Sequence, residues 1–181
     1  MFKNTIFRRM TALVLTLALA AAAALPGLAV YPMPIQTASE TEAVYLFNAD
    51  TGKTILNQNA DQQQYVASLT KLMTALLLLE SGKDLNGEVT VPTALTQEFR
   101  DIQNANGTTM GLRIGETVRR IDLLNAMLIV SANDAASVIA YDVGGSVLDF
   151  VKQMNARAQE LGCTGTNFTC AHGLFAVSYT H

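Results

Sequence analysis

The sequence predicts a mixed α/β (α+β) fold in which an antiparallel hairpin precedes a largely helical region. Apolar and polar residues alternate on both sides of Asp50-Thr51-Gly52, which is typical of two strands joined by a turn. Apolar residues then recur at helical spacing through most of the sequence that follows. Hydrophobic residues make up 50% of the chain and charged residues 15%, so a substantial core can form.

Residues 1–29 have the pattern of an export signal. A positively charged start is followed by an apolar run, which is broken at Pro26-Gly27 and ends in small residues. We predict cleavage after Ala29 and an exported, extracytoplasmic protein in the cell envelope, periplasm or cell-wall space. The alternative is a retained membrane anchor, because the run from Met10 to Ala29 is nearly long enough to span a bilayer.

The elements of the front half follow in order. Residues 30–42 form a polar leading segment, and residues 61–65 form a polar connector. We expect strands at Ala43–Phe47 and Thr54–Leu56, followed by a helix that begins at Ser68 and ends near Ser81-Gly82.

The second half contains a short strand in the sequence GEVTVP and three helices. The first of these helices begins at Thr117 or at Ile121-Asp122, and Arg119-Arg120 is a solvated pair at its start. An interruption at 131–134 then supplies Asn133 or Asp134 as the N-cap of the next helix, and Asp134 is a cap rather than an acid catalyst. The last two helices are expected over Ala135–Val143 and Ser146–Leu161.

Composition excludes several function classes. The formal net charge is −3 and no basic block occurs, so nucleic acid is not an expected partner. No metal or other cofactor is expected, because the two histidines lack a zinc-peptidase spacing, and His172 is assigned a structural or loop role. Cys163 and Cys170 are expected to be free, partly buried thiols, although a bridge between them is the alternative in an oxidising compartment.

Ser68 and Lys71 are the first candidate catalytic residues. Side chains three apart at the start of a helix lie on the same face, so the amine can reach the hydroxyl. A serine becomes nucleophilic when a base takes its proton, and burial against apolar neighbours lowers the pKa of a lysine enough for that task. The alternative is a helix cap beside a solvated charge.

Ser131-Ala132-Asn133 is the second candidate group. It lies at a predicted corner between two helices, where a hydroxyl can relay a proton and an amide can bind a substrate amide. Taken alone, this group is better explained as an ordinary loop that carries a capping asparagine.

In this order, S-x-x-K and S-x-N resemble the first two motifs of penicillin-binding proteins and class A β-lactamases, whose third motif is K-T-G. The segments ASLTKLMTALL, MGLRIGETVRRIDLLNAMLIVSANDAA and FVKQMNARAQELGCTGTNF are similar to those of serine-type D-alanyl-D-alanine carboxypeptidases, the low-molecular-mass penicillin-binding proteins. The resemblance covers roughly Ala43 to Leu174. It implies a serine β-lactamase/transpeptidase-like fold over residues 43–175, with a helical subdomain and the front hairpin of an antiparallel sheet.

The resemblance also implies a role for each candidate residue. Ser68 would attack the carbonyl between the terminal D-alanines of a peptidoglycan stem peptide, and Lys71 would be the base. Ser131 would pass a proton to the departing D-alanine, and Asn133 would bind the peptide. Water would then hydrolyse the acyl-enzyme, and β-lactams would acylate Ser68 as substrate mimics.

The sequence departs from the family pattern towards its end. No K-T-G follows Asn133, and residues 176–181 do not resemble the expected continuation. We therefore expect a gene fragment with a non-native tail at 176–181 and an incomplete sheet, showing little or no turnover. A C-terminal membrane anchor, as in many relatives, would lie in the missing part.

Three alternative functions remain open. A class A β-lactamase would prefer aspartate at the position of Ala132 and needs a deacylating glutamate, for which only Glu160 follows. A D,D-endopeptidase is closer to the sequence. A non-catalytic penicillin-recognising module would explain the absent third motif.

Overall fold

The computed structural model describes residues 41–175 and 179–180. The predicted export signal, residues 1–29, lies outside this part of the chain. Of the predicted leading segment, residues 30–42, only the last two positions are described. Most of the predicted tail, 176–181, is also outside it. Among the described helices, none has both the length and the apolar character needed to cross a bilayer.

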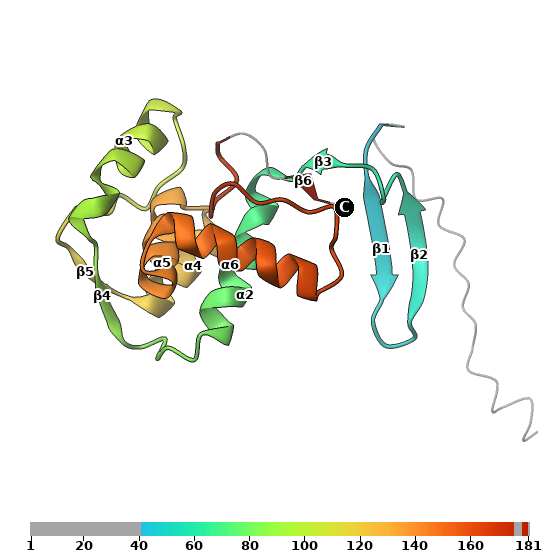
Figure 1. Ribbon diagram of the computed structural model, residues 1–181, viewed down its shortest axis with the longest axis horizontal. Helices are drawn as coiled ribbons and strands as arrows, with labels where there is room; N and C mark the ends of the chain where they lie inside the picture. Colours follow the sequence, from blue (N-terminus) through green and yellow to red (C-terminus); the bar gives the residue numbers. More distant parts are fainter. Residues whose placement is uncertain (1–40, 176–178, 181) are drawn as a thin grey trace, which may run out of the picture. The chain divides into compact units, whose positions relative to one another are not determined.

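The first two strands form the predicted antiparallel hairpin (Figure 1). Strand β1 covers Val44–Asn48 and β2 covers Lys53–Gln58. The turn between them contains Gly52, whose φ of 67° lies in the left-handed region that glycine adopts without steric cost. The hairpin prediction is confirmed, although β2 extends further at both ends than the predicted strand.

Two further strand pairs are short. β4 (Glu88–Thr90) pairs antiparallel with β5 (Thr117–Arg119), and β3 (Gln64–Tyr65) pairs with β6 (Tyr179–Thr180). β4 confirms the strand predicted in GEVTVP. A helix start at Thr117 is wrong, because Thr117 pairs with Thr90 in a strand. The helix begins only after this ladder ends.

The described residues form five α-helices, and the first two of them each follow a short 3₁₀ turn. The helices are α2 (Thr70–Glu80), α3 (Thr96–Asn104), α4 (Arg120–Ile129), α5 (Asn133–Gly144) and α6 (Val147–Glu160), and the turns are η1 (Ala67–Leu69) and η2 (Thr93–Leu95). Gly82 follows α2 with a φ of 68°, which is the left-handed conformation expected of a glycine that ends a helix. Ser146 caps α6 by accepting the N–H of Asp149.

The pattern of apolar residues does not predict α3. Within this helix only Phe99 and Ile102 are apolar. Ile102 is fully buried, and Leu95 in the preceding 3₁₀ turn is only 2% exposed. Tertiary burial of these few side chains therefore stabilises a helix whose own sequence is mostly polar.

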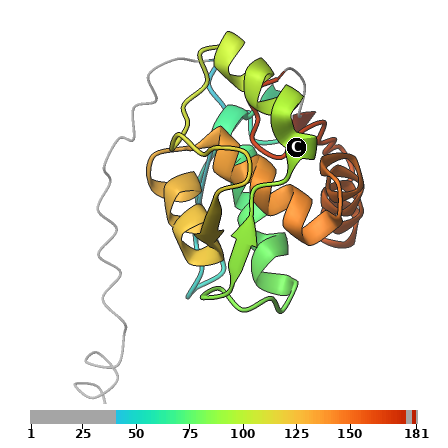
Figure 2. The ribbon, with the colours of Figure 1, turned by 90° about the vertical axis from the view of Figure 1, so that its left-hand side faces the viewer.

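Helix α5 is the centre of the helical region. It contacts α2, α3, α4 and α6, and Figure 2 shows it between α4 and α6. Every residue from Asn133 to Ala140 is buried. One apolar cluster joins α5 to α2 and α4, and a second joins it to α6 and to Phe168 and Ala171. This packing holds the N-terminus of α5 in one place relative to the other helices.

Arg120 links the start of α4 to α5. Its guanidinium makes two hydrogen bonds to the Asp142 carboxylate, at 2.7 and 3.0 Å, and the two side chains are 14% and 10% exposed. The expectation of a solvated pair therefore describes Arg119 but is wrong for Arg120. Burial raises the pKa of Asp142, but the hydrogen bonds and charges of Arg120 and Lys83 together outweigh burial and hold it below its usual value.

We predict that Asp142→Asn lowers the free energy of unfolding by about 3 kcal/mol at pH 7, because Arg120 loses its counter-charge. The folded-state pKa of Asp142 is depressed, so its stabilisation is present above the unfolded value of 3.8 and is lost as the pH falls through the folded value. Denaturant unfolding at several pH values measures both effects. Asp122→Asn is the control, because its ion pair with Arg119 is exposed and should contribute little. Equal losses for the two variants would contradict the prediction.

Candidate active site

Ser68 lies in the 3₁₀ turn η1, directly before α2. The preceding residue, Ala67, has a φ of 46°, which is an unusual conformation for a residue with a side chain. Ser68 is exposed, and α2 has no side-chain cap, its N-cap being Leu69. The reading of Ser68 as a helix cap is therefore not supported, and its hydroxyl is free to make other contacts.

Lys71, one turn further on, is only 2% exposed. Its Nζ donates to Ser68 Oγ at 3.1 Å, to Asn133 Oδ1 at 2.8 Å and to the backbone carbonyl of His172 at 2.8 Å. Burial lowers the pKa of Lys71 from 10.5 to about 8, although the nearby Cys170 thiol opposes this shift. Lys71 is therefore not a solvated surface charge, and a sizeable fraction of it is neutral at mildly alkaline pH.

The three contacts of Lys71 fix which way its lone pair points. Asn133 Oδ1 and the His172 carbonyl oxygen are acceptors only. When the amine is neutral, its two hydrogens are needed for these two oxygens. The lone pair is then left for the third neighbour, the Ser68 hydroxyl, which is the arrangement that a general base requires.

Ser131 approaches Ser68 from the corner between α4 and α5. Its Oγ donates to Ser68 Oγ at 2.9 Å, and its φ of 61° is again in the left-handed region. Strained residues of this kind persist only where the surrounding structure holds them. Both Ser131 and Ala67 adopt this conformation. They bring the hydroxyls of Ser131 and Ser68 and the amine of Lys71 together.

Asn133 is the first residue of α5 and is 4% exposed. Its Oδ1 accepts from Lys71, and its Nδ2 donates to the carbonyl of Thr108 at 3.0 Å. The backbone N–H of Asn133 donates to the same carbonyl, at 2.8 Å. These contacts give Asn133 a role in orienting Lys71 that the sequence did not indicate.

The N-cap prediction for Asn133 or Asp134 is wrong, because the N-cap of α5 is Ala132. Asp134 is 2% exposed, and its carboxylate accepts the backbone N–H groups of a neighbouring loop. The donors are Met110, Gly111, Leu112 and also Ala135. Asp134 therefore organises the loop that follows Thr108 rather than the end of its own helix.

Residues 170–175 complete the surroundings of Lys71. The carbonyl of His172 accepts from Lys71, and the carbonyl of Ala171 accepts from Thr74 Oγ1 at 2.6 Å. The ring of His172 is fully buried, so the structural role predicted for this residue is correct but its contact with Lys71 was missed. No residue type marks a backbone carbonyl, and the sequence held no signal that could have revealed it.

A pocket of about 420 Å³ opens beside these residues. Ser68, Lys71 and Ser131 lie on its wall, and the rest of the lining is apolar: Val66, Leu69, Leu72, Met127 and Leu128. A second pocket, of about 480 Å³, is lined by α3 and the 106–112 loop and by Asp134, and includes none of the four predicted site residues. The pocket at Ser68 is therefore the one that could hold a reacting group.

Cys163 and Cys170 are free thiols, the first half-buried and the second buried. The described residues include no group of three or more histidine, cysteine, aspartate or glutamate side chains that could hold a metal ion.

The chain matches known proteins along most of its length. The family described as D-alanyl-D-alanine carboxypeptidase matches residues 32–179. D-alanyl-D-alanine carboxypeptidase DacF of Bacillus subtilis is 33% identical over 77% of this chain and 35% of its own length. A D-alanyl-D-alanine endopeptidase of Pseudomonas aeruginosa is 34% identical over 78% of this chain and 44% of its own length. The chain thus spans less than half the length of these curated relatives.

Solved structures give the same result. The crystal structure of the Streptomyces K15 DD-transpeptidase has 29% sequence identity and a TM-score of 0.68, covering 75% of this chain and 54% of that one. Penicillin binding protein 5 from Haemophilus influenzae has 34% identity and a TM-score of 0.60, covering 71% of this chain and 38% of that one. These likenesses confirm the predicted serine β-lactamase/transpeptidase-like fold.

We predict that Lys71 titrates with a midpoint near pH 8 instead of its ordinary 10.5. The ¹³Cε resonance of labelled lysine measures this, and Lys71→Arg identifies the resonance by its loss. Because the folded state then binds fewer protons than the unfolded chain between these values, the contribution of Lys71 to stability rises with pH across that window. A midpoint at 10.5 would contradict the burial of the amine.

We predict that Gly173→Ala destabilises the protein by more than about 2 kcal/mol, because the added Cβ would lie 1.9 Å from the carbonyl oxygen of Ala67. Gly173 also has a φ of 76°, which by itself costs about 1 kcal/mol with alanine. Gly52→Ala is the matched control, with a φ of 67° and no atom within 4 Å of the added Cβ. Thermal unfolding compares the two variants, and equal losses would show that the contact with Ala67 is unimportant.

Proposed function

This chain belongs to the D-alanyl-D-alanine carboxypeptidase family, and from that premise we propose that it is a serine D,D-carboxypeptidase with Ser68 as its nucleophile. The substrate is a peptidoglycan stem peptide, from which the terminal D-alanine is removed. One observation carries the proposal: the amine of Lys71 and the hydroxyl of Ser131 converge on Ser68 Oγ, at 3.1 and 2.9 Å.

The reaction uses these contacts in sequence. Neutral Lys71 accepts the hydroxyl proton of Ser68 while Oγ forms a bond to the carbonyl carbon between the two D-alanines. The C–N bond to the terminal D-alanine then breaks, and Ser131 passes a proton to the departing amine. Lys71 restores the proton of Ser131, and water hydrolyses the acyl ester to free Ser68.

Asn133 has two tasks in this proposal. Its Oδ1 orients Lys71, and the remaining hydrogen of its Nδ2 binds a carbonyl of the stem peptide. The apolar pocket beside Ser68 receives the methyl groups of the substrate. β-Lactams acylate the hydroxyl of Ser68 in place of the substrate. Residues 1–29 direct export to the cell envelope, where peptidoglycan is accessible.

A D,D-endopeptidase is the second candidate function. It is favoured by the 34% identity to a D-alanyl-D-alanine endopeptidase of Pseudomonas aeruginosa. Both reactions break a peptide bond that follows a D-alanine, and both can use Ser68, Lys71 and Ser131 in the same roles. The two functions therefore differ in the substrate and not in the chemistry at Ser68.

We predict that a fluorescent penicillin labels the protein at Ser68. Ser68→Ala should reduce labelling to background, and Lys71→Arg should slow it by about 10²–10⁴-fold, since a guanidinium does not accept a proton. Labelling should rise with pH through the Lys71 midpoint near 8, because only the neutral amine is a base. Ser81→Ala, at the exposed far end of α2, should label like the unaltered chain.

The products distinguish the candidate functions. Measured on a longer chain that includes a K-T-G motif, release of D-alanine from a pentapeptide identifies a carboxypeptidase, and cleavage of a cross-linked dimer identifies an endopeptidase. Rapid release of hydrolysed penicillin identifies a β-lactamase, and stable labelling without any peptide cleavage identifies a penicillin-recognising module. A folded chain that no penicillin labels at Ser68 would refute the proposal.

A further inference from the structure

We propose that Glu98 and His172 form a positioning pair, which fixes the backbone carbonyl of His172 as an acceptor for Lys71 and so keeps the lone pair of that amine on Ser68. The consequence for reactivity rests on the proposed function of Lys71 as the base. The positioning itself is a property of the folded chain and can be measured without any reaction.

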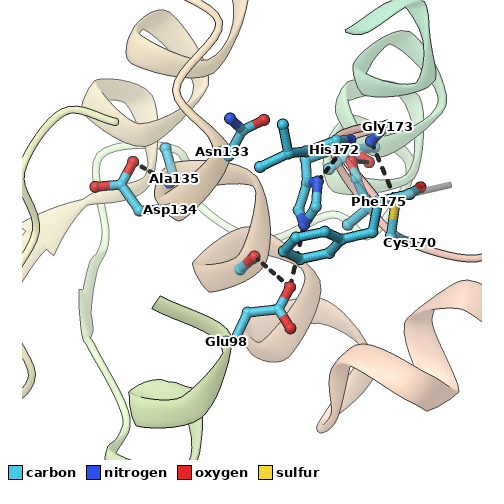
Figure 3. A network of polar contacts seen from close by, with 12 residues as sticks. Glu98, Asn133, Asp134, Ala135, Cys170, His172, Gly173 and Phe175 are labelled. Carbon is cyan, nitrogen blue, oxygen red and sulfur yellow. Dashed lines mark hydrogen bonds and ion pairs between the residues drawn. The ribbon is translucent and has the colours of Figure 1, made fainter. Parts of the chain in front are cut away.

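The ring of His172 is held from three sides (Figure 3). Its Nε2 lies 3.1 Å from Glu98 Oε1, and its Nδ1 lies 3.0 Å from the backbone N of Leu174. The ring of Phe175 meets it edge to face, with ring centroids 5.1 Å apart and an interplanar angle of 77°. The ring is 0% exposed, so water does not compete for its nitrogens.

These contacts determine the position of the proton on the ring. The N–H of Leu174 is a donor, so Nδ1 must accept and, when the ring is neutral, its hydrogen is on Nε2. Burial lowers the pKa of His172, but the hydrogen bonds with Cys170 and Glu98 raise it above its ordinary value, so the neutral ring is the form that applies at alkaline pH. Nε2 then donates to the carboxylate of Glu98. Because one nitrogen is tied to the backbone of residue 174 and the other to α3, the ring cannot turn without breaking a buried hydrogen bond.

Glu98 is itself held in place by a second contact. The Oγ of Ser137, on α5, donates to the same Oε1 at 3.1 Å. The hydrogen bond from His172 lowers the pKa of Glu98, although burial opposes this, so the carboxylate is ionised and accepts strongly. Glu98 thus connects α3, α5 and residues 170–175, which explains why the polar helix α3 is packed beside a site that it does not enter.

The carbonyl of His172 depends on this anchorage. Its neighbour Gly173 has a φ of 76°, a conformation that lets the chain pass close to Ala67 but that also gives the backbone freedom to move. The side chain of His172 removes that freedom. With the carbonyl fixed 2.8 Å from Lys71 Nζ, one hydrogen of the neutral amine is committed to it, and the lone pair stays on Ser68.

Two variants separate positioning from a simple effect of charge. Glu98→Gln removes the negative charge but keeps a side-chain oxygen that can accept from Nε2. Glu98→Ala removes both the charge and the acceptor. Positioning predicts that the glutamine variant behaves like the unaltered protein and the alanine variant does not, whereas a charge effect predicts that the two variants change alike.

The test is a ¹³C NMR titration of the full chain, following Lys71 ¹³Cε and the backbone ¹³C′ of His172. In the unaltered protein both resonances should show a step at the Lys71 midpoint, because the carbonyl accepts from the amine. Burial raises the pKa of the nearby Cys170 thiol, but its contacts with His172 lower it to about 7, so any step from this thiol is recognised by its loss in Cys170→Ser. Glu98→Gln should keep the common step at the Lys71 midpoint. Glu98→Ala should remove the response of the His172 carbonyl and lower the Lys71 midpoint by about one pH unit, since the charged amine loses an acceptor.

Penicillin labelling at pH 9, where Lys71 is mostly neutral in every variant, gives the second readout. Glu98→Ala should slow labelling about tenfold and Glu98→Gln less than about twofold. Glu116→Ala is the control, because Glu116 is exposed and its carboxylate accepts a local N–H, that of Arg113. If Glu98→Ala does not fold, Glu98→Asp, which retracts the acceptor by one methylene, should show the same changes at smaller size.

Each outcome decides the inference. An unchanged or raised Lys71 midpoint in the folded Glu98→Ala protein overturns it, as does a His172 carbonyl that still titrates with Lys71. Equal changes in the Glu98→Ala and Glu98→Gln variants also overturn the inference, because they show that the charge of Glu98 matters and its position as an acceptor does not. If penicillin labels no variant, the proposed function fails, while the titration still decides whether Glu98 and His172 position the carbonyl.

Discussion

The rest of the structure depends on one constraint, which is that Lys71 is buried and still has an acceptor for every hydrogen on its amine. An ammonium without partners in this position would be strongly destabilising. The three acceptors come from three separate parts of the chain: Ser68 in η1, Asn133 at the start of α5 and His172 in the last described loop. The fold is therefore organised so that these parts meet at a single nitrogen.

Close packing around α5 makes this meeting possible. The buried first half of α5 is rich in alanine and serine, so neighbouring helices can approach its axis closely. The backbone around the site is correspondingly strained, with Ala67 and Ser131 both in the left-handed region. Gly173 passes so near Ala67 that no side chain would fit between them. The helical core supplies the stability that offsets this local strain.

The proposed chemistry uses Ser68 as nucleophile, Lys71 as base and Ser131 as proton relay, and the three groups lie at hydrogen-bond distance. In this proposal Ser68, Lys71 and Ser131 would account for how a bond to D-alanine is broken, but not for which bond is chosen. Relatives named as carboxypeptidases and as endopeptidases resemble this chain to a similar degree, at 33% and 34% identity. The selection of a terminal or an internal bond must therefore depend on contacts further from Ser68 than these three residues.

Spacing along the sequence determined the hairpin, most of the helices and the pairing of Ser68 with Lys71, because those features depend on contacts within a turn or two of the chain. The order of the S-x-x-K and S-x-N motifs and the resemblance to the family, more than residue type alone, identified Ser131 and Asn133 as candidates. Only the tertiary structure decided that α3 is a helix, that Arg120 is an inward ion pair, and that Asp134 holds a distant loop. It alone placed the carbonyl of His172 beside Lys71, 101 residues away in sequence. The physical reason is that a backbone carbonyl is the same in every residue, so only the packing of the folded chain shows which one accepts a given proton.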